Sequence, residues 1–137
     1  MPLSYKIDTE HRLVLANATG ILTIDDIFAY QRDAWSRPEL RGFNELVDMT
    51  GVESVNPPAA DQLRAFSEFA ATMDAMIGES NLAIIAKGDL DFGLARMFQA
   101  FREMNPDSKK IVSVFRSMND ALDFLGIKDP GILSKNA

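Results

Sequence analysis

Short apolar runs of strand length alternate along this chain with longer stretches whose apolar residues recur every three or four positions. The strand-length segments are Leu13 to Ala16, Phe43 to Asp48 with Leu46 and Val47 as its apolar centre, Leu82 to Ala86, and Ile111 to Phe115. Strands that alternate with helices are joined by crossovers, and crossovers build a mainly parallel sheet with helices packed on it. The alternation therefore predicts an α/β fold.

Four helices are expected, and their ends carry recognisable signals. The helices follow Thr23, follow Asn56-Pro57-Pro58, run from about Leu90 to Asn105, and run from Ser117 to Leu125. Thr23 and Ser117 are placed as N-caps, and Gly78 is placed to close the second helix. One apolar stripe marks that second helix, formed by Leu63, Phe66, Ala70, Met73 and Ile77.

The chain begins with a hairpin pattern. Tyr5 and Ile7 alternate with polar neighbours, as in an edge strand paired with Leu13 to Ala16, and Gly20 is expected to break the second strand. The order β-β-α-β-α-β-α-β-α predicts a mixed, mainly parallel sheet of five strands with about four helices around it. We expect one domain over residues 1–128 and a loose tail over 129–137.

Charge and composition limit the classes of partner. The net charge of the 137 residues is −6, and Lys and Arg are scattered, whereas nucleic acid needs a concentrated basic face. The chain has no cysteine, which excludes disulfides, thiolate metal sites and thiol nucleophiles. Its longest purely apolar stretch, Leu82 to Ala86, is far shorter than a membrane span. We therefore expect no nucleic-acid partner and no stable membrane insertion, and, since no secretory signal is visible, a cytoplasmic location.

Five short strings occur in a familiar order over nearly the whole chain. They are Gly20 to Thr23, Glu45 to Asp48, Phe92 to Phe98, Val114 to Ser117 and Ala121 to Leu125. This ordered set resembles the SpoIIAA-like, or STAS/SEC14-like, family of small bacterial proteins, which are relatives of the STAS domains of anti-sigma-factor antagonists. The resemblance implies a mixed sheet with helices packed around it, and it implies no settled activity.

The resemblance also bears on a phosphorylation switch. In the anti-sigma antagonists an Asp-x-Ser segment after the third strand leads to an Asp-Ser pair that opens the next helix, and the Ser of that pair is phosphorylated. Asp48-Met49-Thr50 resembles the first part, whereas Asn56-Pro57 stands in the place of the pair when no gaps are allowed. Proline has no hydroxyl, so the switch is expected to be absent.

The carboxyl ends of parallel strands, where helix N-termini also point, are the natural place for a ligand or partner. The polar, charged and aromatic candidates expected there are Asp48, Thr50, Ser54, Asn56, Lys87, Asp89, Asp91, Phe92, Arg96 and Arg116. A structural interpretation of the same residues is favoured: Asp89 or Asp91 caps the third helix, Arg96 pairs with one of them, and Asp48, Thr50 and Ser54 satisfy turn amides.

The second and third helices carry more apolar residues than one stripe requires. The candidates for a dimer interface or an apolar ligand cleft are Phe69, Met73, Met76, Met97, Phe98 and Phe101. Met and Phe at helical spacing usually belong to the core, and that interpretation is favoured for most of them.

Groups typical of catalysis and metal binding are scarce. His11 is the only histidine and falls at the hairpin turn, where a solvated role is expected. No Gly-x-Ser-x-Gly elbow and no phosphate-binding glycine loop occur. We expect no metal, no cofactor and no catalytic residue, although an enzyme using Asp48, Lys87, Asp89 or Arg96 stays a minor alternative.

Two functional hypotheses remain. The first is a non-catalytic regulatory or protein-interaction module, expected to be a homodimer. The alternative is a carrier or sensor of a small apolar or amphipathic ligand, which predicts a cavity lined by Met and Phe between the second and third helices and the sheet.

Overall fold

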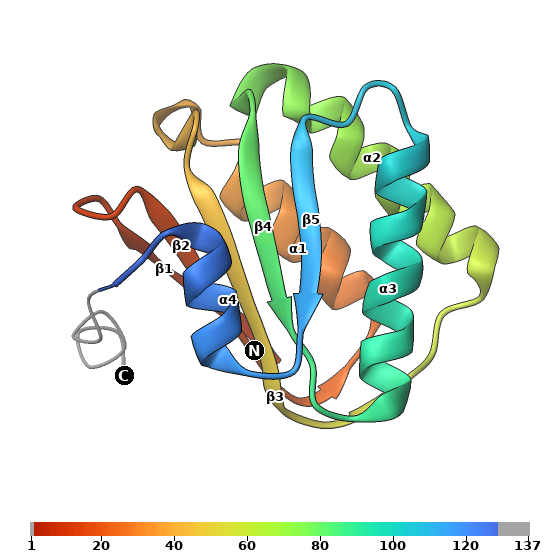
Figure 1. Ribbon diagram of the computed structural model, residues 1–137. Helices are drawn as coiled ribbons and strands as arrows, with labels where there is room; N and C mark the ends of the chain where they lie inside the picture. The colour runs from red at the N-terminus through yellow and green to blue at the C-terminus, as the bar shows by residue number, and fades with distance from the viewer. Residues whose placement is uncertain (1, 129–137) are drawn as a thin grey trace.

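The computed structural model describes residues 2–128, and within them five strands form one sheet (Figure 1). The expected loose tail, 129–137, lies outside the described residues. The strands are β1 (Leu3–Asp8), β2 (Leu13–Leu22), β3 (Asn44–Val55), β4 (Ser80–Ile85) and β5 (Lys110–Phe115). They lie side by side in the order β1-β2-β3-β4-β5, with β1 and β2 antiparallel and the other pairs parallel. The prediction of a mixed, mainly parallel five-stranded sheet is therefore confirmed.

The helices are α1 (Ile24–Trp35), α2 (Ala60–Ile77), α3 (Asp89–Met104) and α4 (Met118–Leu125), with a short 3-10 turn at Pro38–Leu40. Thr23 caps α1 in a capping box with Asp26, and Ser117 caps α4 by accepting the Asp120 amide. Gly78 ends α2 with a φ of 82°, a conformation that glycine adopts without strain. The four predicted helices agree with the structure, and so do the end signals at Thr23, Gly78 and Ser117.

Two strands are longer than the sequence indicated. β2 continues through Gly20 to Leu22, and β3 continues past Asp48 to Val55. Gly20 has a φ of 67° and lies at a shift in the β2–β3 register, so it forms an irregularity inside the strand and does not end it. The two extensions pair with each other, Gly20 with Val52 and Leu22 with Val55, which supplies hydrogen-bond partners that a local pattern does not reveal.

The sheet separates two apolar layers. Figure 1 shows α4 on one face and α1, α2 and α3 on the other. Leu13, Leu46 and Ile85 pack under α4, whereas Leu82, Ile84 and Val112 face α2 and α3. Because helices cover both faces, central strands such as β4 are buried on both sides.

Candidate functional site

The C-terminal ends of strands β3 and β4 meet the N-terminus of α3. We call this end of the sheet the rim. A surface depression of about 410 Å³ lies there, lined by the β3 extension from Met49 to Val55 and by the loop and first turn from Lys87 to Asp91. It brings together five of the residues expected from sequence, namely Thr50, Ser54, Lys87, Asp89 and Asp91. Residues separated by more than thirty positions in the chain therefore share one surface.

Arg116 joins the loops that follow β4 and β5. Its guanidinium donates to the Lys87 carbonyl at 2.8 Å and to Asp89 Oδ1 at 3.2 Å, and it lies 4.2 Å from the centroid of the Phe92 ring. The ion pair of Asp89 is thus with Arg116, not with Arg96, which is exposed on α3. These contacts hold the rim in shape.

Other residues near the rim have structural roles in the strands and in the first turn of α3. Asp48 Oδ1 accepts the Thr50 amide at 2.9 Å, as the structural interpretation of this segment expects. The α3 helix begins one residue earlier than expected, with Gly88 as a cap that offers no side-chain hydrogen bond, so Asp89 and Asp91 fall in its first turn and do not cap it. Partial burial raises the pKa of Asp91 above its ordinary value. The Asn56 amide donates to the Leu22 carbonyl at 3.0 Å while its side chain is exposed.

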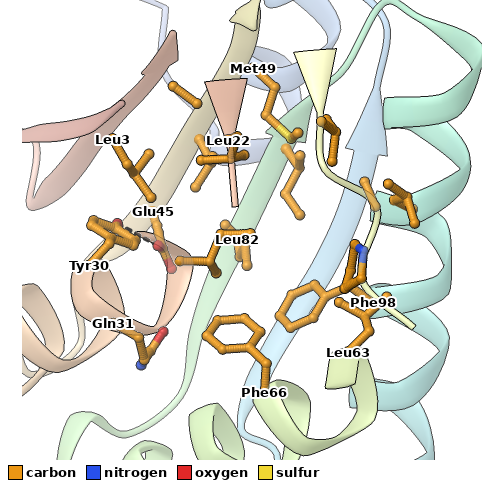
Figure 2. Close-up of a pocket in the computed structure, with 18 of the residues that line it drawn as sticks. Leu3, Leu22, Tyr30, Gln31, Glu45, Met49, Leu63, Phe66, Leu82 and Phe98 are labelled. Carbon is orange, nitrogen blue, oxygen red and sulfur yellow. Dashed lines mark hydrogen bonds between the residues drawn. The ribbon is translucent and has the colours of Figure 1, made fainter. Parts of the chain in front are cut away.

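A second hollow, partly open to solvent, lies between the sheet and helices α1, α2 and α3. It is a cavity of about 120 Å³ with a mainly apolar lining (Figure 2). Phe66 and Leu82 point into it, and its few polar lining residues are Tyr30, Gln31, Glu45 and Arg102. The remaining lining comes from Leu3, Ala18, Leu22, Ile27, Val47, Met49, Val55, Pro58, Leu63, Ile84, Leu94, Ala95 and Phe98.

The apolar candidates on α2 and α3 have different surroundings. Phe98 lines the cavity, whereas Phe69, Met73, Met76, Met97 and Phe101 are not among its lining residues. Phe69 stacks on Phe28 and Phe101 lies under Arg64, so both are half-buried, and Met73 accepts a hydrogen bond from Gln31 through its sulfur. Met76 and Met97 are exposed. The expected surplus therefore divides into packed residues and exposed ones.

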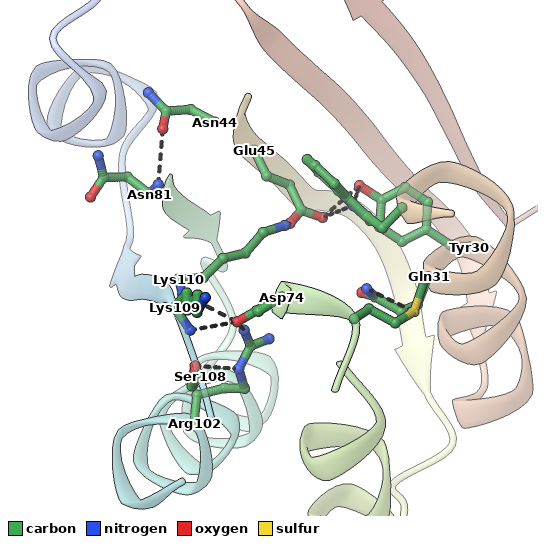
Figure 3. A network of polar contacts seen from close by, with 12 residues as sticks. Tyr30, Gln31, Asn44, Glu45, Asp74, Asn81, Arg102, Ser108, Lys109 and Lys110 are labelled. Carbon is green, nitrogen blue, oxygen red and sulfur yellow. Dashed lines mark hydrogen bonds and ion pairs between the residues drawn. The ribbon is translucent and has the colours of Figure 1, made fainter. Parts of the chain in front are cut away.

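Beside the cavity, Glu45 is the centre of a buried polar network (Figure 3). One carboxylate oxygen accepts from Tyr30 Oη at 2.5 Å and from Trp35 Nε1 at 3.1 Å. The other accepts from Lys110 Nζ at 2.6 Å, and that ammonium also lies over the Trp35 ring. Every oxygen of the buried charge thus has a partner, as burial of a carboxylate requires.

A second buried ion pair, Asp74 with Arg102, stands next to the first (Figure 3). The same Asp74 oxygen also accepts the backbone amides of Lys109 at 2.7 Å and Lys110 at 3.2 Å, while Arg102 Nε donates to Ser108 Oγ at 2.9 Å. The pair therefore ties α2 and α3 to the start of β5.

Burial shifts the proton equilibria of this network. It raises the pKa of the Tyr30 hydroxyl well above its ordinary value, and the neighbouring Glu45 carboxylate acts in the same direction. It lowers the pKa of Lys110, an effect that Glu45 opposes. This network was not predicted from the sequence, although an acidic residue inside each of two apolar patterns, Glu45 and Asp74, was a usable signal.

The fold has a counterpart among solved structures. No family model matches the chain, and no curated protein matches its sequence. Among solved structures, an uncharacterized protein of the DUF3478 family from Shewanella loihica, described as having a SpoIIAA-like fold, matches with a TM-score of 0.56 at 19% identity. The match covers 90% of this chain and 93% of that one. The fold is SpoIIAA-like. This agrees with the resemblance in the sequence and extends to the fold alone.

The segment that resembles the antagonists' phosphorylation site sits differently from what the resemblance implied. In this SpoIIAA-like fold Asp48-Met49-Thr50 lies within β3 and not after it. Asn56-Pro57 follows β3 directly, but α2 begins only at Ala60, capped by Ala59. The residues in the place of the Asp-Ser pair therefore precede the helix without opening it.

Three residues with metal-ligand atom types lie at the opposite end of the SpoIIAA-like sheet, at the end of β1 and in the β1–β2 turn. Asp8, Glu10 and His11 have potential ligand atoms that all lie within 4.8 Å of one another. His11 Nδ1 lies 3.0 Å from Asp8 Oδ2, so a local contact within the turn accounts for this closeness. Among the described residues, no helix is long and apolar enough to cross a membrane.

Proposed function

We propose that this chain is a non-catalytic, SpoIIAA-like interaction module that contacts a protein partner through the rim. The observation that carries the proposal is the shared surface formed there by the C-terminal part of β3 and by the loop after β4, which are far apart in sequence. Lys87, Thr50 and Ser54 are exposed on it, while Arg116 holds the underlying loops together. A surface whose loops are joined by hydrogen bonds and that presents exposed polar side chains suits contact with a partner of moderate affinity.

The ionic groups of the rim favour contact over catalysis. Asp48 and Asp89 are committed to the Thr50 amide and to Arg116, and the distances of these contacts are those of ordinary structural bonds. The single histidine lies in the β1–β2 turn, at the opposite edge of the sheet. We also expect regulation by partner binding without serine phosphorylation, and a homodimer in the cytoplasm; the rim contact depends on neither.

Site-specific photocrosslinking in cells tests the rim. A benzophenone amino acid at Thr50 or Lys87 is expected to capture one and the same partner protein, because both positions line the same depression. The matched control places the probe at Glu79, an exposed residue at the opposite edge beside the start of β4. If all three positions capture the same mixture, or the two rim positions capture nothing, the proposal is wrong.

The cavity favours the alternative function, binding of a small apolar ligand. Its volume of about 120 Å³ is of the size that accepts a single ring or a short branched chain. The polar lining residues, of which Tyr30, Glu45 and Arg102 belong to the buried network, would orient the polar end of an amphipathic molecule. Only Met49, Phe66 and Phe98 match the Met and Phe lining that this hypothesis predicted.

Benzene provides a direct test of this alternative. Ala95 is buried, lies on α3 and lines the cavity, so Ala95→Leu is expected to fill it. Benzene in the buffer should raise the melting temperature of the wild-type protein and leave that of Ala95→Leu unchanged. An equal effect on both proteins would exclude the cavity as the binding site. Native mass spectrometry of gently purified protein then looks for a natural ligand.

A further inference from the structure

The outward face of α3 is apolar where a monomer would be expected to present charges. Leu90, Met97 and Met104 recur every seven residues and are 55%, 40% and 73% exposed. Gly93 and Ala100, also exposed, lie between them at the positions that complete an a/d pattern. Ala95, Phe98 and Arg102 bury the opposite side of the same helix. The apolar seam therefore points directly away from this chain's own core.

Nothing within the folded chain requires glycine at position 93. A Cβ atom built there would meet no other atom within 4 Å. Glycine in the interior of a helix is the least favourable choice apart from proline. Its presence in the middle of the seam is explained if another backbone or a large side chain approaches the helix at that point.

We propose that a second copy of this chain packs its own α3 antiparallel against this seam, in the register that places large residues opposite small ones. In that register Met104 of each chain faces Gly93 of the other, and Met97 faces Ala100. Large and small residues then interdigitate in four layers across a two-fold axis, as closely packed helices require. This inference rests on the homodimer expected above and names its interface.

The charges beside the seam fit the same arrangement. Arg96 and Glu103 lie on the same flank of the seam, but seven residues separate them, or about 10 Å along one helix, so they are too far apart to pair directly within it. In the antiparallel register Arg96 of one chain lies within about 3 Å, along the axis, of Glu103 of the other. The two-fold axis forms this pair twice. The flank thus complements itself, which favours a second copy as the occupant.

A lipid surface suits this face less well. The flank carries Asp89 and Glu103 as well as Arg96, whereas helices that lie on membranes are rich in Lys and Arg on their polar side. The net charge of −6 also repels an anionic surface on average.

Oligomeric state and a charge exchange test the interface. In sedimentation and light scattering the wild-type protein should be a dimer. Met97→Glu should be a monomer, and Arg96→Glu should raise the dimer dissociation constant by about tenfold or more, because like charges then face each other. The exchange Arg96→Glu with Glu103→Arg should restore the wild-type constant. Met76→Glu, on an exposed site of α2, is the matched control and should leave the dimer intact.

Introduced cysteines test the register, since the chain has no native cysteine. Gly93→Cys and Met104→Cys chains should not form disulfides when each is oxidised alone, because equivalent positions lie about 16 Å apart along the axis. A mixture of the two variants should form a disulfide-linked heterodimer. Crosslinking of either variant with itself in preference to the mixture would contradict the antiparallel register.

A monomeric wild-type protein at high concentration, or a dimer that Met97→Glu leaves unchanged, overturns the proposal. Flotation with phosphatidylglycerol–phosphatidylcholine vesicles identifies the other occupant: a monomer that binds vesicles, and loses binding with Met97→Glu, assigns the face to lipid. The rim proposal is judged independently, because photocrosslinking at Thr50 and Lys87 reports a partner whether or not α3 pairs.

Discussion

The Lys110 ammonium lies 3.3 Å from the centroid of the Trp35 ring and 2.6 Å from Glu45 Oε1, inside the protein. Lys110 begins β5, Trp35 ends α1 and Glu45 lies near the start of β3. One buried cation thus joins an edge strand of the sheet to its centre and to a covering helix. The aromatic face and the carboxylate together replace the water that the ammonium loses.

Removal of that cation should be costly. Lys110→Met keeps much of the side-chain volume but leaves Glu45 buried without its counter-charge, so we expect a loss of about 3–5 kcal/mol in the free energy of unfolding. Glu45→Gln combined with Lys110→Met should recover most of this loss, because the amide oxygen still accepts from Tyr30 and Trp35. Urea denaturation measures both. Arg116→Met, in an exposed ion pair, is the control and should change stability by no more than about 1 kcal/mol.

Tyr30 should make the protein sensitive to alkaline pH. Its pKa is raised well above the ordinary value of 10.0 by burial and by Glu45. Above pH 10 the unfolded tyrosine loses its proton while the folded one keeps it, so this contribution to stability is complete below pH 10 and declines as the pH rises toward the folded pKa. Tyr30→Phe lacks this decline. The difference in unfolding free energy between the wild-type protein and Tyr30→Phe should therefore shrink between pH 9 and pH 11, about one unit either side of the ordinary tyrosine pKa of 10.0. A constant difference would contradict the prediction.

At alkaline pH Lys110 changes the free energy of unfolding in the opposite direction to Tyr30. The effect of Tyr30 must therefore be measured by comparison with Tyr30→Phe. The pKa of Lys110 is lowered by burial, so between its folded pKa and the ordinary value of 10.5 the unfolded state binds more protons. Stability then rises with pH across that window. Since both proteins contain Lys110, the difference between them isolates Tyr30.

Substitutions of Asp74 should lower the free energy of unfolding by amounts that depend on which of its contacts each one removes. Asp74→Ala removes the partner of Arg102 and of two backbone amides, and we expect a loss of about 3–5 kcal/mol. Asp74→Asn keeps an oxygen for the Lys109 and Lys110 amides and loses only the charge, so its loss should be smaller. Ser108→Ala removes a single hydrogen bond to Arg102 and should cost about 1 kcal/mol. Thermal and urea unfolding would refute this order if the alanine and asparagine variants were equally stable.

The parts of the fold that follow from local chemistry were predictable. Thr23, Gly78 and Ser117 mark helix ends through their own side chains or backbone freedom, and the apolar run from Leu82 to Ala86 marks a strand buried on both faces. The extensions of β2 and β3 were not predictable in this way. They are strands because each supplies the other's hydrogen-bond partners across thirty residues of sequence, and Gly20 permits the irregularity between them.

For the candidate site, too, some features followed from the sequence and others depend on packing between distant segments. The position of the rim followed from strand order, so Thr50, Ser54, Lys87 and Asp89 could be expected together. Arg116 was also expected at the rim, but its ion pair with Asp89 was not, because strand order does not give the distances between side chains. The cavity exists because side chains from three helices and the sheet leave space between them. Hydrophobic periodicity predicts which residues are buried but not how completely they fill the space.

The cavity itself should reverse the usual result of enlarging a core residue. Extra methyl groups in a well-packed interior typically cost 1–3 kcal/mol. Ala95 borders about 120 Å³ of space, so Ala95→Leu should instead stabilise the protein by about 0.5–2 kcal/mol. Ala83 is also buried, but it lies on the face under α4 and is not among the residues that line the cavity, so it provides the control. Ala83→Leu should destabilise. Chemical denaturation of the two variants decides the matter: a loss of similar size in both would mean that the helices over the sheet already pack to native density.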